Sequence, residues 1–121
     1  MPDAIETLML DNLLAVFNER DPELRRAAIE RTYATDVRWT DDEGVTTGHA
    51  GLDAKCVALQ SNLGDQQFAA DGPVRQLSGF GYLGWHLVDP ASGTPVLSGF
   101  DTALIANGVI TDLWTVLIPP Q

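Results

Sequence analysis

The chain has 121 residues, of which 45% are hydrophobic and 20% charged, a composition typical of one globular domain and not of a disordered chain. Seventeen acidic residues against seven basic ones give a net charge of −10, which argues against binding to nucleic acid or to an anionic membrane. One cysteine, no signal-peptide pattern and no apolar run of about 20 residues predict a single domain over residues 1–121, cytoplasmic and without a membrane partner.

Three stretches of the chain show helical periodicity. Apolar residues recur at intervals of three and four over residues 5–17, which predicts a helix with one apolar face. A second helix is predicted over residues 22–33, with Asp21 as its N-terminal cap. A third is predicted over residues 49–63, and Gly64 fits its C-terminal cap.

The period changes to two after the second helix and again beyond residue 66. In the first of these stretches Val37, Trp39 and Asp41 face one side of a strand. Asn107-Gly108 is a strong hairpin signal between the last two strands. Long neighbours joined by tight turns pair antiparallel, so the chain is predicted to be α+β, with helices packed on one face of a curved sheet. The later strands are predicted over residues 66–70, 74–78, 80–88, 94–106 and 109–118.

Two acidic residues, Asp41 and Asp101, occupy strand positions whose same-face neighbours are apolar or small. A carboxylate on the inner face of a sheet costs several kcal/mol unless it is paired, hydrated or protonated. Two interpretations follow. Each side chain bonds backbone amides or a buried water, with Asp41 capping the turn at 41–44, or both face a cavity with pKa values raised towards the range of proton transfer.

Other patterns predict no cofactor and no metal. The glycines of residues 79–84 match the sequence pattern of a dinucleotide-binding fingerprint, but a strand is predicted after them where that fingerprint requires a helix. They are therefore interpreted as sites of sheet bending. His49 and His86 are far apart, with no further ligand at metal-binding spacing. Cys56 is predicted to be a buried packing residue.

Two segments resemble a known family. The segment 33–44 (YATDVRWTDDEG), followed by Gly48 at the start of a helix, is similar to the first half of the nuclear transport factor 2-like superfamily, and the segment 98–110 (SGFDTALIANGVI) to its penultimate hairpin. The similarity is strongest to the SnoaL-like branch, which includes polyketide cyclases, and to ketosteroid isomerases. It implies a cone-shaped, cystatin-like fold in which three N-terminal helices close the concave face of a strongly curved antiparallel sheet. It also implies a deep hydrophobic pocket and a homodimer.

The resemblance to ketosteroid isomerases implies roles for particular residues. Asp41 falls on the general base, and Asp101 on a carboxylic acid that stays protonated and donates a hydrogen bond to the enolate oxygen. Tyr33 falls on a tyrosine that supports the oxyanion hole. Phe17 falls at, or within one helical turn of, the position of the family's principal oxyanion tyrosine. Phenylalanine has no hydrogen-bond donor, and this departure speaks against steroid isomerisation itself.

The period of two predicts which side chains share the pocket and which face outwards. Trp114 and Val116 are predicted on the convex face, where an exposed apolar stripe suits the interface of a homodimer. By the same period Leu113 and Leu117 are predicted to face the pocket with Asp101, along with Trp39 and Trp85. Together with Phe17 and Tyr33, which the resemblance places there, and His86, these are the residues predicted to bind a substrate beside Asp41 and Asp101. For His86 the alternative is a hydrogen-bonded strand histidine without a functional role.

Three functions are compatible with these predictions. The first is a cofactor-free isomerase or cyclase that uses Asp41 and Asp101 in acid–base chemistry on an apolar carbonyl substrate. The second is a non-catalytic module of the same fold that binds an apolar small molecule or dimerises. The third is a water-activating hydrolase or dehydratase, in which the paired carboxylates position the water.

Overall fold

The computed structural model describes residues 4–118. The chain forms a six-stranded sheet with helical segments packed on one side of it. Within these residues no helix has both the length and the apolar character needed to cross a bilayer. The helical segments are α1 (Ala4–Asp11), its π-helical continuation η1 (Asn12–Phe17), α2 (Pro22–Thr32) and α3 (Gly48–Leu63). The strands are β1 (Tyr33–Asp41), β2 (Gly44–Thr47), β3 (Gln67–Leu77), β4 (Phe80–Val88), β5 (Pro95–Ala106) and β6 (Val109–Ile118).

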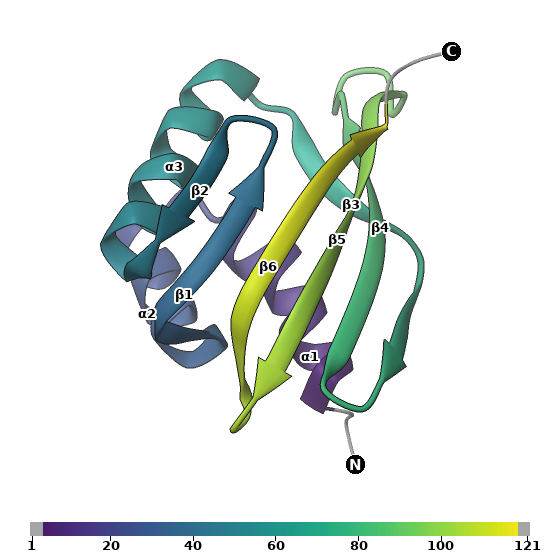
Figure 1. Ribbon diagram of the computed structural model, residues 1–121. Coiled ribbons are helices and arrows are strands. Elements are labelled where there is room, and N and C mark those ends of the chain that lie inside the picture. Colours follow the sequence, from purple (N-terminus) through teal and green to yellow (C-terminus); the bar gives the residue numbers. More distant parts are fainter. Residues whose placement is uncertain (1–3, 119–121) are drawn as a thin grey trace.

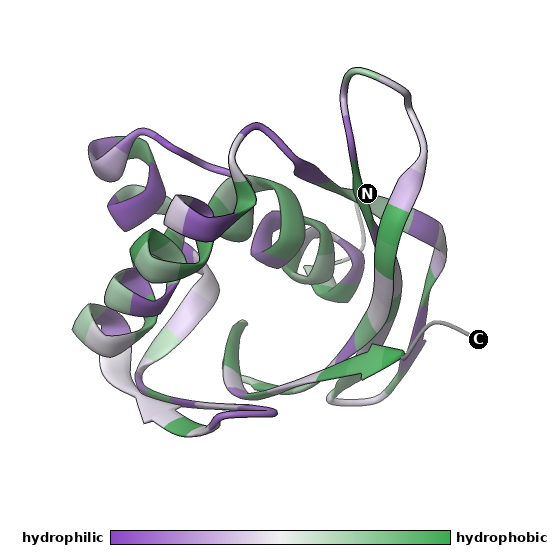
Figure 2. Cartoon of the chain, turned by 90° about the horizontal axis from the view of Figure 1, so that it is seen from above, coloured by the Kyte–Doolittle hydropathy of each residue, from purple (hydrophilic) through white to green (hydrophobic). Residues whose placement is uncertain are grey.

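The sheet has the order β2-β1-β6-β5-β4-β3, and the helices cover its concave side, as Figures 1 and 2 show. The predicted α+β class and the placement of the helices on one face are therefore confirmed. One detail differs, because β1 pairs with β6 in parallel, with Trp39 opposite Leu113, so that the sheet is mixed and open. Tight turns dictate antiparallel pairing only between consecutive strands, and no such turn links β1 to β6.

Strand β3 is continuous where two short pieces were predicted. It pairs with β4 along its whole length, with a register shift between Asp71 and Arg75. Gly72 has a φ of 82°, and Pro73 has no N–H group to donate, so the ladder bulges at these two residues and resumes beyond them. The residues that predict a turn at this point thus form a bulge within one strand.

The first helix extends to Phe17 as predicted, but it widens into a π-helix at Asn12. Asn12 lies four residues after Leu8 and four before Val16, on the apolar face of the helix. It is fully buried, like its neighbour Leu13. Asn12 is thus a polar residue on the buried face of this helix.

The second helix begins as predicted and is fixed to α3. The Asp21 side chain accepts hydrogen bonds from the backbone N–H groups of Glu23 and Leu24. Arg25, only 2% exposed, pairs with Asp53 of α3 at 2.6 Å and donates to the side chain of Gln60 at 3.3 Å. These contacts hold α3 over the concave face of the sheet.

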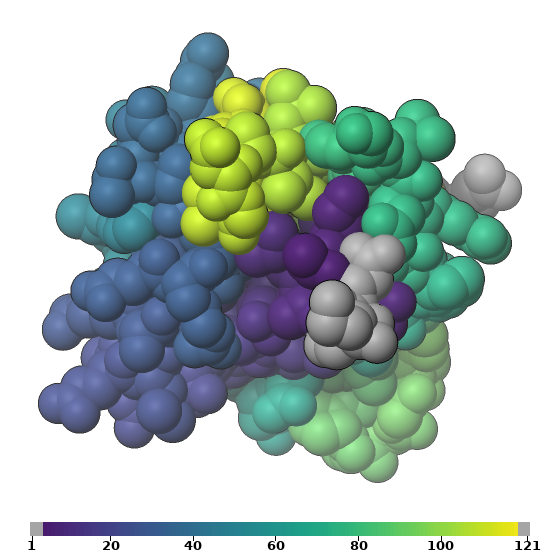
Figure 3. Space-filling model, turned by 90° about the horizontal axis from the view of Figure 1, so that it is seen from below, coloured from purple at the N-terminus to yellow at the C-terminus, as the bar shows by residue number. Residues whose placement is uncertain are grey.

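The first helix, α1, closes one end of the space between helices and sheet. Figure 3 shows this end, where α1 lies between the turn that joins β5 to β6 and the turn that joins β3 to β4. Gly81 makes the close approach possible, because a Cβ atom there would lie 2.8 Å from Met9. The cavity described next is lined from the opposite end of the sheet, by the β1–β2 turn and the C-terminal half of α3.

Candidate functional site

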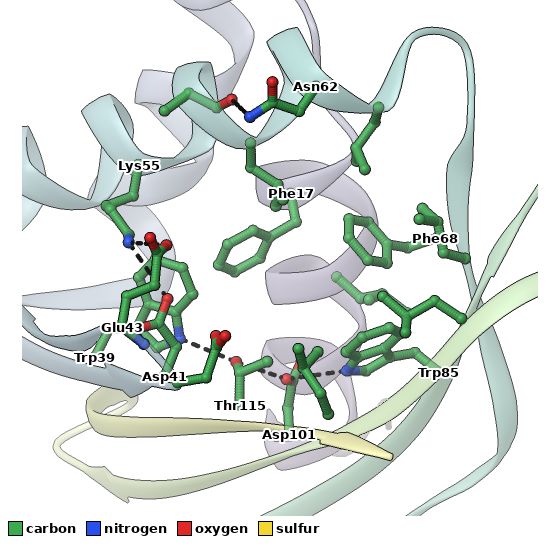
Figure 4. Close-up of a pocket in the computed structure, with 18 residues that line it drawn as sticks. Phe17, Trp39, Asp41, Glu43, Lys55, Asn62, Phe68, Trp85, Asp101 and Thr115 are labelled. Carbon is green, nitrogen blue, oxygen red and sulfur yellow. Dashed lines mark hydrogen bonds and ion pairs between the residues drawn. The ribbon is translucent and has the colours of Figure 1, made fainter. Parts of the chain in front are cut away.

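A cavity of about 350 Å³ lies between the concave face of the sheet, η1 and α3. Its walls are mostly apolar and include two pairs of aromatic rings in contact, Phe17 with Trp39 and Phe68 with Trp85, each with ring centroids 5.1 Å apart (Figure 4). Its volume lies at the lower end of the usual range for small-molecule sites, about 300–1,000 Å³. The aliphatic residues of the lining are Leu13, Ala58, Leu59, Leu63, Leu87, Leu97 and Leu117.

The floor of the cavity holds the carboxyl group of Asp101, which is 2% exposed. Its Oδ1 accepts hydrogen bonds from Oγ1 of Thr115 at 2.9 Å and from Nε1 of Trp85 at 3.2 Å. Its Oδ2 accepts one from Nδ2 of Asn12 at 2.9 Å. Thr115 lies directly opposite Asp101 in the β5–β6 ladder, so the pairing of the two strands sets the first of these bonds.

The donors around Asp101 are themselves held in place by further hydrogen bonds. Nε1 of Trp39 donates to Oγ1 of Thr115 at 2.9 Å, which leaves the Thr115 hydroxyl proton free to point at Asp101. The Tyr33 hydroxyl donates to Oδ1 of Asn12, which turns the amide N–H₂ of Asn12 towards Asp101. Each of these groups is neutral, so hydrogen bonds rather than an opposite charge stabilise the Asp101 carboxylate.

Burial raises the pKa of Asp101 from 3.8 to about 6, and the hydrogen bonds from Thr115, Trp85 and Asn12 oppose that rise. The group is therefore ionised at neutral pH and protonated in mildly acidic solution. A carboxyl group with a pKa near 6 exchanges its proton at little cost close to neutral pH, as general acid–base chemistry requires.

A glycine makes room for one of these donors. Gly99 lies opposite Trp85 in the β4–β5 ladder, and a Cβ atom at Gly99 would lie 2.4 Å from Cζ2 of the indole and 2.6 Å from the carbonyl oxygen of Val116. Only glycine therefore lets the Trp85 ring lie flat across β5, where its N–H reaches Asp101.

The rim of the cavity holds Asp41, whose side chain is 10% exposed. Its Oδ1 accepts a hydrogen bond from the backbone N–H of Glu43 at 3.0 Å, as the turn-capping interpretation predicts. Its Oδ2 lies 3.4 Å from Nζ of Lys55 on α3. Asp41 thus caps its turn and lines the cavity at the same time.

Lys55 is a rim residue that the sequence analysis missed. Nζ of Lys55 lies 2.8 Å from Oε1 of Glu43 and 5.5 Å from the centre of the Trp39 ring. The hydrogen bond with Glu43 raises the pKa of Lys55 and lowers the pKa of Glu43. A signal was available, because the lining residues of α3 follow helical spacing on one face: Lys55, Ala58, Leu59, Asn62 and Leu63.

Four of the predicted substrate-binding residues line the cavity, namely Phe17, Trp39, Trp85 and Leu117, together with Asp41 and Asp101. Two others lie behind it. Leu113 is fully buried in the core, and Tyr33, 1% exposed, reaches Asp101 only through Asn12. For Leu113 the period of two gave the correct face of the sheet but not the depth of the side chain.

His86 lies on the opposite side of the sheet from the cavity, so the prediction that it binds a substrate is wrong. Its neighbour Trp85 faces inwards, and alternation therefore turns His86 outwards. Its ring contacts Oγ of Ser98 at 2.8 Å and Oδ2 of Asp71 at 3.2 Å. The alternative of a hydrogen-bonded strand histidine describes it correctly.

No three His, Cys, Asp or Glu side chains between residues 4 and 118 are grouped so that they could hold a metal ion. Cys56 is fully buried on α3, and burial raises the pKa of its thiol to about 12.

Solved structures of similar shape exist, although no protein-family model and no curated protein matches the chain. A presumed isomerase of the SnoaL-like family from Agrobacterium tumefaciens is 25% identical, with a TM-score of 0.88 over 96% of this chain and 98% of that one. A presumed ketosteroid isomerase from Kribbella flavida is 17% identical, with a TM-score of 0.71 over 98% and 80% of the two chains. TerC, crystallised with polyporic acid, is 18% identical, with a TM-score of 0.72 over 96% and 92%.

Proposed function

Because this chain is, by its fold, a member of the nuclear transport factor 2-like superfamily, we propose that it binds an apolar small molecule in the cavity and transfers a proton to or from it. The proposed reaction is the isomerisation or cyclisation of a carbonyl compound, with the chain's own carboxyl groups as acid and base. The printed descriptions of its structural neighbours, a SnoaL-like isomerase and a ketosteroid isomerase, support this class. TerC with polyporic acid supports the binding of a small molecule by this fold.

The observation that carries the proposal is the state of Asp101. An apolar cavity holds an ionisable group with neutral partners and a pKa of about 6, so that protonated and ionised forms are both accessible near neutral pH. In the protonated form Asp101 donates a hydrogen bond or its proton to a developing enolate oxygen. Such a donor in a water-poor site is worth far more than in bulk solvent.

Asp41 is the proposed base. The Lys55 ammonium at 3.4 Å compensates the negative charge of the Asp41 carboxylate, and a carboxyl group has to be ionised before it can remove a proton from carbon. Asp41 lies at the rim beside Trp39 and Asp101 at the floor, so both carboxyl groups face a ligand held in the cavity.

Proton exchange into a bound ketone tests the proposal. A panel of cyclic enones and 1,3-diketones is incubated with the protein in D₂O, and deuterium at the α-carbon is followed by NMR. The wild-type protein is expected to accelerate exchange, and Asp41→Asn and Asp101→Asn to lower the rate about 100-fold, with little change in affinity for these neutral compounds.

The matched control is Asp36→Asn, which removes one carboxylate from the exposed surface of β1 and is expected to leave exchange unchanged. Exchange that persists in both cavity variants contradicts the proposed roles of Asp41 and Asp101.

One observation favours a second candidate, a module that binds a small molecule without chemistry. Three donors already occupy the oxygens of Asp101, and a carboxylate with its hydrogen bonds filled also serves as a purely structural acceptor. Ligand binding without accelerated exchange in the wild-type protein would favour this second function.

A further inference from the structure

The charges around the cavity are unbalanced. Among the described residues, four acidic side chains line it, Asp41, Asp42 and Glu43 at the rim and Asp101 at the floor, against one cation, Lys55. Asp101 has only neutral hydrogen-bond partners among the described residues, so its charge is not compensated within the site. A cavity with apolar walls focuses such a field, and a positively charged group entering it is stabilised.

The rim already holds one ammonium group in a recognisable geometry. Nζ of Lys55 lies 2.8 Å from Glu43, 3.4 Å from Asp41 and 5.5 Å from the centre of the Trp39 ring. Figure 4 shows Lys55 extending from α3 towards the two carboxylates beside the Trp39 indole. Two carboxylates and an aromatic face are the groups that recognise an alkylammonium ion.

The remaining walls suit the apolar body of the same ligand. Phe17, Phe68 and Trp85 face the interior behind the rim, and aliphatic side chains fill the space between them. A cavity of about 350 Å³ accommodates a molecule of bicyclic size. The site therefore combines an anionic mouth with an aromatic interior.

We infer that the ligand of this cavity is a lipophilic amine, whose protonated nitrogen binds at the acidic rim beside Trp39, in competition with the Lys55 ammonium, while its apolar body lies among the aromatic rings. The inference rests on the proposed function, since it needs the cavity to bind a small molecule, and it adds the charge of that molecule. Lys55 then acts as a tethered competitor, which a ligand amine displaces from Asp41 and Glu43.

Three probes that differ only in charge test the inference: 2-naphthylmethylamine, 2-naphthylmethanol and 2-naphthoate. Binding to the full chain is measured by titration calorimetry at pH 7.5 in low and high salt. The amine is expected to bind about tenfold more tightly than the alcohol, and the carboxylate most weakly. High salt is expected to narrow these differences.

Two pairs of variants locate the effect at the rim. Lys55→Gln is expected to raise the affinity for the amine severalfold, because it removes the competing cation, and Asp41→Asn to lower it severalfold. Arg38→Gln and Asp36→Asn are the matched controls, since each makes the same change of charge on the exposed surface of β1. Both controls are expected to leave the three affinities close to those of the wild type.

Several outcomes would overturn the inference. Tightest binding of 2-naphthoate, weakened by Lys55→Gln, would make Lys55 an anchor for anions, and equal binding of all three probes would show that the cavity does not select charge. In both cases the proposed binding of an apolar molecule would stand. Failure of all three probes to bind would overturn the inference and count against the proposed function as well.

Discussion

Burial of the Asp101 carboxyl group affects the stability of the fold as well as the chemistry of the cavity. Its pKa is raised from 3.8 to about 6 in the folded chain, so the folded state holds this proton more tightly than the unfolded state does. The contribution of Asp101 to the free energy of unfolding is therefore largest below about pH 4, and it is lost as the pH rises to about 6. A shift of this size corresponds to about 3 kcal/mol.

Asp101→Asn is expected to remove this pH dependence, because the amide does not titrate. The difference in free energy of unfolding between wild type and variant, measured by urea denaturation from pH 4 to pH 7, is expected to change by about 3 kcal/mol in favour of the variant. Asp36→Asn, at an exposed position, serves as the control. A constant difference across this range would show that Asp101 has the same pKa in the folded and unfolded chains.

Some site residues could be predicted from the sequence and others could not, for identifiable reasons. Asp41 and Asp101 stand out because each interrupts an apolar alternation in a strand. Asn12 lies on the apolar face that the spacing predicts for the first helix, but one polar residue on such a face carries no signal that it bonds to Asp101. Lys55 was missed because the inner face of α3 was assigned from its apolar residues alone.

At the scale of secondary-structure elements, the cross-strand pair of Trp85 and Gly99 sets the position of one donor to Asp101. Gly99→Ala places a methyl group 2.4 Å from the indole and 2.6 Å from the Val116 carbonyl oxygen, so the ring or the strand has to move. The variant is expected to lose about 1–3 kcal/mol of stability. Chemical denaturation gives the loss, and near-ultraviolet circular dichroism reports the displacement of the ring.

A double-mutant cycle with Trp85→Leu separates the two clashes. In the Trp85→Leu background Gly99→Ala is expected to cost less, because only the contact with the Val116 carbonyl remains. An equal cost in both backgrounds would mean that Gly99 does not serve to accommodate the indole.

The elements themselves were predicted well wherever local signals decide them. The hairpins β4–β5 and β5–β6 follow from turn residues and alternation, and Asp21 and Gly64 mark the ends of helices. The parallel pairing of β1 with β6 was not predictable in this way, because strands far apart in sequence are brought together by the packing of α2 and α3 and not by a turn.

At the scale of the whole molecule, the convex face of the sheet presents exposed apolar side chains. Trp114 is 37% exposed, and Leu104, Val116 and Ile118 are between 42% and 45% exposed. Their neighbours in the strands, such as Leu113 and Thr115, face the concave side, so alternation gathers the exposed group on one surface. We propose that this surface pairs two copies of the chain in a homodimer.

Trp114→Glu is expected to convert the dimer to a monomer, because it places a charge at the centre of the apolar surface. Sedimentation velocity over a range of concentrations measures the change. Leu24→Glu is the control, since Leu24 is 59% exposed on α2, away from the sheet. A wild-type protein that remains monomeric, or a Trp114→Glu variant that remains dimeric, contradicts the proposed interface.

The α+β architecture could be predicted because helical periodicity precedes a series of hairpin signals. The cavity could not be derived from the residues in the same way, because its size depends on how Phe17, Trp39, Phe68 and Trp85 pack against one another. The rings pack in two pairs that both line the cavity, and a different choice of side-chain rotamers would fill that space.

The open sheet has a further consequence for self-association. An unpaired edge is a template on which another chain can add a strand, and aggregation often starts there. Here one edge is β2, with only four residues, and the other is β3, which is interrupted by a bulge containing Pro73. Both edges are thus poor templates for extending the ladder from one molecule to the next, which protects the chain against fibrous assembly.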